Sequence, residues 1–185
     1  MKVIEFLGMP KNGKTTIWDK LKKKLKREGY EVGEIYEAAQ VNCLDKNDSF
    51  EYHTWNINTM LSELLERVDK KSYFDFVLLD RGIYDSLVFT RALHEAGKIT
   101  KNQKRGTEKY LKQFLHLVDG AVLFHDNPGH SLSKDYDEEG RVINEGFLYK
   151  LYRQYDELKL PSDSLILNTS EFNPNVEKIK KFILE

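Results

Sequence analysis

Residues 4–21, IEFLGMPKNGKTTIWDKL, join an apolar run to a helical pattern through a loop that contains two glycines. The loop from Gly8 to Thr15 has the spacing G-x-x-x-x-G-K-[ST], which is typical of a phosphate-binding loop. The match is specific because a strand-like run precedes the loop and a helical pattern follows it. We therefore predict that this loop binds the phosphates of a nucleoside triphosphate, and the reaction has to be inferred from the rest of the chain.

Each residue type in the loop has a physical reason to be there. Gly8 is expected to let the chain turn sharply away from the strand, and Gly13 to let the backbone come close to an anion. The backbone N–H groups and the start of the helix then form a concave set of donors for phosphate. Lys14 is expected to reach the β- and γ-phosphates, and the Thr15 hydroxyl to bind Mg²⁺. The residues predicted to hold the nucleotide are Gly8, Lys11, Asn12, Gly13, Lys14, Thr15 and Thr16.

Length and composition indicate an ordinary globular chain. Its 185 residues, 40% of them hydrophobic, are enough for one domain with a substantial core. The formal net charge of −1 argues against nucleic acid as the main partner. The single cysteine, Cys43, excludes an intramolecular disulfide and a cysteine-based metal cluster. The N-terminal apolar stretch is too short for a signal peptide, and no apolar run approaches the ~20 residues of a membrane span. We therefore expect a cytoplasmic protein without a membrane partner.

Apolar runs and helical periodicities alternate along the chain. Continuous apolar runs predict strands at 2–7, 31–36, 73–80, 120–126 and 163–169, and helical periodicity predicts helices at 14–28, 50–71, 84–96, 104–118, 145–158 and 173–184. Strands that are apolar throughout and alternate with helices indicate a single α/β domain, residues 1–185, with a five-stranded parallel sheet covered on both faces. The polar segment 127–145 is weakly patterned, and a loop this long is commonly functional or disordered.

A charged pair follows the third apolar run, in the stretch FVLLDRGIYDS. Asp80 stands where a parallel sheet is expected to carry a metal-directed or catalytic carboxylate, and the alternative is a solvated residue that caps the next helix. Arg81 can grip an acceptor phosphate or stabilise the charge on a transferring group, and the alternative is a plain ion pair. Asp85 is expected to be only a charge at the N-terminus of the following helix.

Together these motifs resemble those of P-loop kinases of the nucleoside and nucleotide kinase group, which includes thymidylate kinases and deoxynucleoside kinases. The resemblance covers most of the chain and rests on GMPKNGKTT, on Glu37 after the second apolar run, on DRGIYDS and on DNPGHSLSK. The acid after the second strand, with the DRG..D stretch, is also similar to a branch that includes ribosylnicotinamide-kinase-like proteins. The resemblance implies a three-layer P-loop NTPase fold with the strand order 2-3-1-4-5, and a lid at approximately 127–145.

The resemblance also implies roles for individual residues. The implied catalytic residues are Lys14, Glu37, Asp80, Arg81 and Arg141. Glu37 is implied as the base that takes the proton of an acceptor hydroxyl, with Asp80 as the alternative base. Thr15 is implied as an Mg²⁺ ligand, and Asp80 is implied to hold the metal either directly or through water. If the acceptor is a monophosphate, no strong base is needed and Arg81 grips the acceptor phosphate.

The acceptor pocket is implied to contain Glu37, Trp55, Asn56 and Arg81. A flat ring and an amide suit the recognition of a nucleoside, whereas ordinary packing of Trp55 and solvation of Asn56 are the alternatives. The lid of such kinases commonly carries two or three arginines. Here that segment has only Arg141, with Lys134 at the place of the first arginine and four acids in DYDEEG.

The sequence thus predicts a phosphotransferase that uses ATP or GTP with Mg²⁺ and acts on a nucleoside or a nucleoside monophosphate. Its expected partners are a nucleotide donor and a small-molecule acceptor, and a homodimer is left open. A slow nucleotide-hydrolysing switch is one alternative, although the fourth strand ends in FHDNPG and lacks the Asn/Thr-Lys-x-Asp motif of switch GTPases. A kinase-like protein that binds ligands without catalysis is the other, and the arginine-poor lid favours it.

Overall fold

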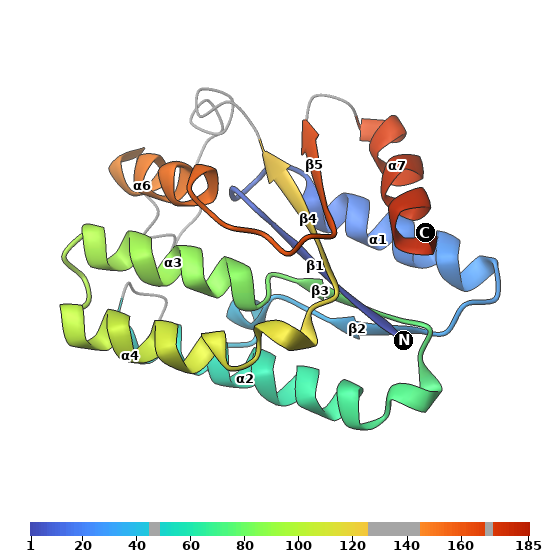
Figure 1. Ribbon diagram of the computed structural model, residues 1–185. Coiled ribbons are helices and arrows are strands. Elements are labelled where there is room, and N and C mark those ends of the chain that lie inside the picture. Colours follow the sequence, from blue (N-terminus) through green and yellow to red (C-terminus); the bar gives the residue numbers. More distant parts are fainter. Residues whose placement is uncertain (45–48, 126–144, 169–171) are drawn as a thin grey trace.

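The computed structural model describes residues 1–44, 49–125, 145–168 and 172–185. In this part of the chain five parallel strands form one sheet in the order β2-β3-β1-β4-β5, with helices on both faces (Figure 1). The strands are β1 (Lys2–Gly8), β2 (Val32–Ile35), β3 (Phe76–Asp80), β4 (Gly120–His125) and β5 (Ser164–Asn168). The α/β class, the parallel sheet and the strand order are therefore confirmed.

The helices agree with the sequence pattern except at some of their ends. They are α1 (Lys14–Arg27), α2 (Phe50–Asp69), α3 (Ile83–Glu95), α4 (Lys101–Lys112), α6 (Glu145–Asp156) and α7 (Phe172–Leu184), with short 3-10 helices η1 (Ala38–Gln40), η2 (Lys71–Tyr73) and η3 (Leu115–Leu117). The helix predicted from residue 104 begins at Lys101 because Thr100 and Gln103 form a capping box. The strand predicted from residue 73 begins only at Phe76, because η2 occupies the preceding residues.

The core forms two layers, one on each face of the sheet. Alternate residues of β1 point to opposite faces, so that Ile4 and Phe6 lie in one layer and Val3 and Leu7 in the other. Helices α1 and α7 complete the first layer, and α2, α3, α4 and α6 contribute to the second (Figure 1). Because both faces are covered, the strands need apolar residues throughout, which explains their continuous apolar runs.

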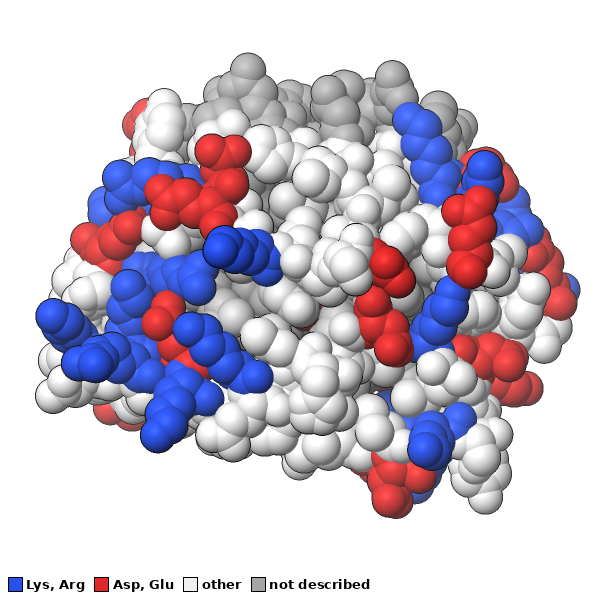
Figure 2. Space-filling model, in the orientation of Figure 1, with Lys and Arg blue, Asp and Glu red and all other residues white. Residues whose placement is uncertain are grey.

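The surface charge is mixed on the side shown in Figure 2. Lysine and arginine side chains gather over α4, which carries Lys101, Arg105 and Lys109, and acidic side chains lie among them. The centre of this face is largely uncharged. Within the described ranges, the helices are all too short or too polar to cross a lipid bilayer. That the chain binds no nucleic acid stays a prediction.

The sheet brings together the residues that the sequence singled out. All five strands run in the same direction, so the segments that follow their carboxyl ends meet at one edge of the sheet. The loop after β1, Glu37 after β2, and Asp80 and Arg81 at the end of β3 therefore become neighbours. Arg141, Lys134 and nearly all of the predicted lid lie outside the described residues.

Candidate active site

The loop between β1 and α1 has the backbone of an anion-binding turn. Gly8 has φ +136°, and a side chain there would clash with the carbonyl oxygen of Phe124 on β4. Gly13, the N-cap of α1, has φ +82°, and Lys11 between them has φ +58°. Successive N–H groups in such a loop, together with the start of a helix, form a concave donor surface for phosphate. The geometry is therefore the one expected of the sequence motif.

Lys14 lies at the bottom of this loop. Its ammonium donates to the carbonyl oxygen of Met9 at 3.0 Å and to Asn12 Oδ1 at 3.3 Å, while Asn12 Nδ2 donates to the carbonyl oxygen of Phe124 at 2.9 Å. Burial, with a smaller contribution from the positive charge of Arg81, lowers the pKa of Lys14 to about 8. The ammonium thus has only neutral hydrogen-bond acceptors in contact, and an anion in the loop would stabilise its charged form.

Thr15 and Asp80 form a pair of oxygen ligands beside the loop. The Thr15 hydroxyl donates to Asp80 Oδ2 at 2.8 Å, whereas Asp80 Oδ1 is buried and has no hydrogen-bond partner. Burial raises the pKa of Asp80, and the nearby charges of Lys14 and Arg81 oppose this shift. A cation in contact with this carboxylate would satisfy the unpaired oxygen and favour the ionised form.

This donor set fits Mg²⁺ in the manner of a nucleotide site. Mg²⁺ prefers oxygen ligands and usually binds through one or two protein groups, with phosphates and waters completing its octahedron. Thr15 and Asp80 supply two such oxygens. In the described ranges, no cluster of three or more His, Cys, Asp or Glu side chains could hold a metal by itself. The arrangement therefore suits a metal that arrives with a nucleotide.

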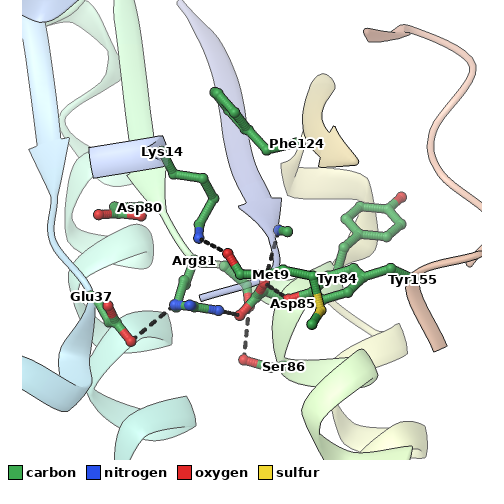
Figure 3. Close-up of polar contacts among 12 residues, drawn as sticks. Met9, Lys14, Glu37, Asp80, Arg81, Tyr84, Asp85, Ser86, Phe124 and Tyr155 are labelled. Carbon is green, nitrogen blue, oxygen red and sulfur yellow. Dashed lines mark hydrogen bonds and ion pairs between the residues drawn. The ribbon is translucent and has the colours of Figure 1, made fainter. Parts of the chain in front are cut away.

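Arg81 lies between the carboxylates of Glu37 and Asp85 (Figure 3). Its Nε is 2.9 Å from Glu37 Oε1, and its Nη1 donates to Asp85 Oδ2 at 2.8 Å. The guanidinium is therefore held in two ion pairs, one to the segment after β2 and one to α3. Burial opposes the charge of Arg81, but Asp85 and Glu37 raise its pKa well above the ordinary value. The guanidinium also faces the ring of Phe89, 5.2 Å from its centroid.

The backbone of Arg81 is strained. Its φ of +67° places a non-glycine residue in the left-handed region, at a cost of about 1–2 kcal/mol. Strain of this kind persists where surrounding contacts define the conformation, and it is common at functional sites. Here the Arg81 N–H donates to the carbonyl oxygen of Phe6 at 3.0 Å, which ties the residue to β1.

Asp85 makes contacts that the sequence did not predict. It lies in the first turn of α3, as expected, but it is only 2% exposed and accepts hydrogen bonds from Arg81 and from the Tyr155 hydroxyl. The prediction that Asp85 is only a helix-terminal charge is therefore wrong. The sequence offered one signal, the spacing of four residues between Arg81 and Asp85, but the tyrosine partner is 70 residues away.

Glu5 is a second residue that sequence reasoning missed. It lies in the middle of β1, is fully buried, and accepts hydrogen bonds from the backbone N–H groups of Gly82, Tyr84 and Asp85 at 2.8–3.1 Å. These are N–H groups at the start of α3 that have no partner within the helix. Burial raises the pKa of Glu5 to about 7, although the three backbone donors favour the anion. Glu5 thus holds the strand-to-helix turn that contains Arg81, and its only signal in the sequence was a charge inside an apolar run.

Glu5→Ala should lower the free energy of unfolding by about 3 kcal/mol or more, because it leaves three buried N–H groups unpaired. Urea denaturation measures this loss. Glu5→Gln retains an acceptor oxygen and should lose less, and Glu157→Ala, at an exposed position, should lose almost nothing. Equal stabilities for the Glu5→Ala and Glu157→Ala variants would contradict this role.

A cleft of about 700 Å³ extends from the phosphate loop past Glu37 and Arg81 to α2 and α3. Of the predicted site residues, those that line it are Lys11, Asn12, Gly13, Lys14, Thr15, Thr16, Glu37, Asn56 and Arg81. Gly8 and Asp80 are buried, and neither of them lines the cleft. Trp55 also does not line it and packs against the core instead, so the geometry gives its predicted role in acceptor binding no support.

The far end of the cleft is mostly apolar with a few polar groups. Its walls are formed by Tyr52, His53, Asn56, Met60, Ser86, Phe89, Leu93 and Phe147. Asn56 Oδ1 accepts from Asn42 Nδ2 at 2.8 Å, which fixes the orientation of the Asn56 amide. An apolar pocket with a few placed hydrogen-bonding groups suits an aromatic, partly polar ligand.

His53 is neutral and has a defined tautomer. Burial lowers the pKa of His53 to about 4. The Thr90 hydroxyl donates to the carbonyl oxygen of Ser86 at 2.7 Å, so it accepts from His53, whose Nε2 is 2.8 Å away. His53 therefore carries its proton on Nε2, and Nδ1 is the unprotonated nitrogen. The sequence pattern gave His53 no role, whereas the structure buries it in the wall of the cleft.

The sheet order and the glycine-rich loop together define a P-loop α/β fold of the kinase type.

No protein-family model matches the sequence, and no curated protein matches it. Among solved structures, two of the deoxyadenosine kinase from M. mycoides are similar over nearly the whole chain. The one with bound dATP has a TM-score of 0.69 at 15% identity and covers 99% of this chain and 100% of that chain. The one with the products dCMP and a flexible dCDP bound has a TM-score of 0.65 at 17% identity and covers 97% and 96%. At this identity the likeness shows a shared fold.

Proposed function

We propose that the protein is a phosphotransferase that moves the γ-phosphoryl group of ATP or GTP to a hydroxyl of a nucleoside. The observation that carries this proposal is that the phosphate loop and the Glu37–Arg81 pair line one continuous cleft. A donor phosphate in the loop and a hydroxyl beside Glu37 would then lie next to each other, and positioning of this kind supplies much of the catalysis in phosphoryl transfer. The fold shared with a deoxyadenosine kinase agrees with this proposal.

The charges around Arg81 favour an uncharged acceptor over a monophosphate. Its guanidinium is already paired with Glu37 and Asp85, so the three groups together carry a net negative charge. A phosphate on the acceptor would have to compete with two carboxylates for one arginine, at a cost in repulsion. A neutral hydroxyl instead finds a carboxylate that can accept its hydrogen bond.

The proposed mechanism assigns each step to a residue. The loop N–H groups and Lys14 bind the β- and γ-phosphates, and Thr15 and Asp80 hold Mg²⁺, which offsets the negative charge of the phosphates. Glu37 orients the acceptor hydroxyl and accepts its proton. Arg81 lies beside this base, and its positive charge would offset part of the negative charge that develops on the transferring group.

A coupled assay of nucleotide consumption with a panel of acceptors tests this function. The panel contains the common nucleosides and their 5′-monophosphates, and the Lys14→Ala variant serves as the blank. Stimulation by at least one nucleoside, with little or none by the monophosphates, is the expected result. Hydrolysis that no acceptor stimulates would indicate a nucleotide switch, binding without turnover would indicate a kinase-like binding protein, and a preference for monophosphates would contradict the charge argument.

Nucleotide affinity should fall as the pH rises above about 8, the pKa of Lys14 in the free protein. A bound polyphosphate stabilises the Lys14 ammonium, so above this pH Lys14 takes up a proton when the nucleotide binds. The dissociation constant of the nucleotide therefore rises by up to about tenfold per pH unit. Below this pH, Lys14 is already charged and its contribution is constant. Calorimetric titrations at pH 7.0, 8.5 and 9.5, in buffers of different ionisation enthalpy, measure both effects. Lys14→Arg, whose charge does not titrate here, should lack the slope, and a pH-independent affinity in the unmodified protein would contradict the prediction.

A further inference from the structure

The Asp85 carboxylate connects three parts of the fold. Its Oδ2 accepts from Arg81 Nη1 at 2.8 Å, and its Oδ1 accepts from the Tyr155 hydroxyl at 2.5 Å (Figure 3). The N–H of Gly8, at the start of the phosphate loop, is 3.5 Å from the same Oδ1. One carboxylate thus joins the end of β1, the first turn of α3, and α6.

Of the two carboxylates that hold Arg81, Asp85 is the better fixed. The Asp85 side chain is 3% exposed, whereas the Glu37 side chain is 30% exposed. The backbone φ of +67° at Arg81 also needs contacts that define it. The orientation of the Arg81 guanidinium therefore depends strongly on where the Asp85 carboxylate is held.

Tyr155 is the side chain that fixes the second oxygen of Asp85. It lies on α6, is 3% exposed and does not line the cleft. Burial and the Asp85 carboxylate raise the pKa of Tyr155 well above its ordinary value, while the neighbouring Arg81 guanidinium opposes this shift. The hydroxyl therefore keeps its proton and donates a hydrogen bond to Asp85. Since α6 packs against α3, this hydrogen bond links two helices that the sequence separates widely (Figure 1).

We propose that Tyr155 is a positioning residue that acts on Arg81 through Asp85, so that the placement of α6 sets the orientation of the guanidinium in the cleft. The expected effect on kcat rests on the proposed function, whereas the effect on the orientation of Arg81 does not. Tyr155 touches neither donor nor acceptor in this scheme. No proton moves between Tyr155, Asp85 and Arg81 in this role, because Tyr155 and Arg81 remain the donors and Asp85 the acceptor.

Tyr155→Phe removes one oxygen atom and leaves the packed ring in place. We expect kcat to fall about tenfold, with the donor KM unchanged, because a misoriented guanidinium affects the transfer step more than nucleotide binding. In an Arg81→Lys background the same change should have no further effect, because the group on which Tyr155 acts is gone. Tyr149→Phe, at an exposed position of the same helix, is the matched control and should behave as the unmodified protein.

A readout that does not need turnover separates this inference from the proposed function. In protein labelled with ¹⁵N-arginine, the Nε–H signal of Arg81 is assigned by its absence in Arg81→Lys. It should shift or broaden in Tyr155→Phe and in Asp85→Asn, and stay unchanged in Tyr149→Phe. If no acceptor is phosphorylated, the proposed function fails while this signal still decides the positioning role.

An unchanged Arg81 signal in Tyr155→Phe would overturn the inference. So would equal losses of kcat in the unmodified and Arg81→Lys backgrounds, because the hydroxyl would then act independently of Arg81. Global unfolding of Tyr155→Phe, seen by circular dichroism, would overturn it as well, because the hydroxyl would then serve stability.

Discussion

Lys14→Ala should reduce turnover by at least about 10³-fold, to the background of the assay, because it removes the ammonium that we propose binds the β- and γ-phosphates. The folded structure should survive. Lys14 donates only to the carbonyl oxygen of Met9 and to Asn12, and both acceptors can bind water in the space that the variant leaves. Nucleotide consumption in the presence of a stimulating nucleoside measures the loss.

The control for Lys14→Ala is Lys23→Ala, which removes an exposed ammonium from the same helix. This variant should retain full turnover, which excludes a general effect of charge or helix stability. Thermal unfolding of both variants should stay within a few degrees of the unmodified protein. Turnover in Lys14→Ala within a few fold of the unmodified protein would exclude the proposed mechanism.

Glu37→Gln should lower kcat by about 10²–10³-fold while the affinity for the nucleotide stays nearly unchanged. The amide keeps the size of the side chain but cannot accept a proton at neutral pH, and it weakens the ion pair with Arg81 Nε. Glu37 lies outside the phosphate loop, so the change should leave most of the nucleotide contacts in place. Steady-state kinetics with a nucleoside acceptor, together with calorimetry of the nucleotide, separate the two effects.

Glu31→Gln is the matched control, because Glu31 is an exposed carboxylate just before β2. It should have no measurable effect on kcat. If Glu37→Gln also retained its kcat within about threefold, while Asp80→Asn lost it, the base would be Asp80 instead. The role of Asp80 as an Mg²⁺ ligand would then need revision.

The apolar pattern predicted most of the fold because both faces of the sheet are covered. In such a sheet each strand is a continuous apolar run. The alternation of strands with helices then allows only a few ways to connect the strands into a sheet. The strand order itself was implied by the resemblance and not by the periodicity. Element ends were less predictable, since a short pair such as Thr100 and Gln103 decides where α4 begins.

The site was predictable where a local motif defines it. The spacing from Gly8 to Thr15 and the Asp80–Arg81 pair need only neighbouring residues and a strand before them. Glu5, Asp85 and Tyr155 were missed because their roles arise from contacts between distant segments. A buried carboxylate in a strand, such as Glu5, looks like an irregularity in the pattern until the backbone N–H groups of α3 are placed above it.

Of the two side chains of α2 that were implied for the acceptor pocket, Asn56 lines the cleft and Trp55 does not. Side chains one and two positions apart on a helix point in different directions, so a small error exchanges the residues that face a cleft. His53 and Asn56 line the cleft, whereas Trp55 between them is partly buried against the core. The resemblance implied the tryptophan for this pocket, and a flat ring suits the recognition of a nucleoside.

The central claim is that a Mg²⁺-bound nucleoside triphosphate occupies the loop between β1 and α1. Calorimetric titration of the unmodified protein with ATP or GTP, with and without Mg²⁺, tests it most directly. We expect saturable binding of at least one of the two with a stoichiometry of one, strengthened by Mg²⁺ and weakened at least about tenfold in Lys14→Ala. The absence of saturable binding of either nucleotide to the folded protein would contradict the account.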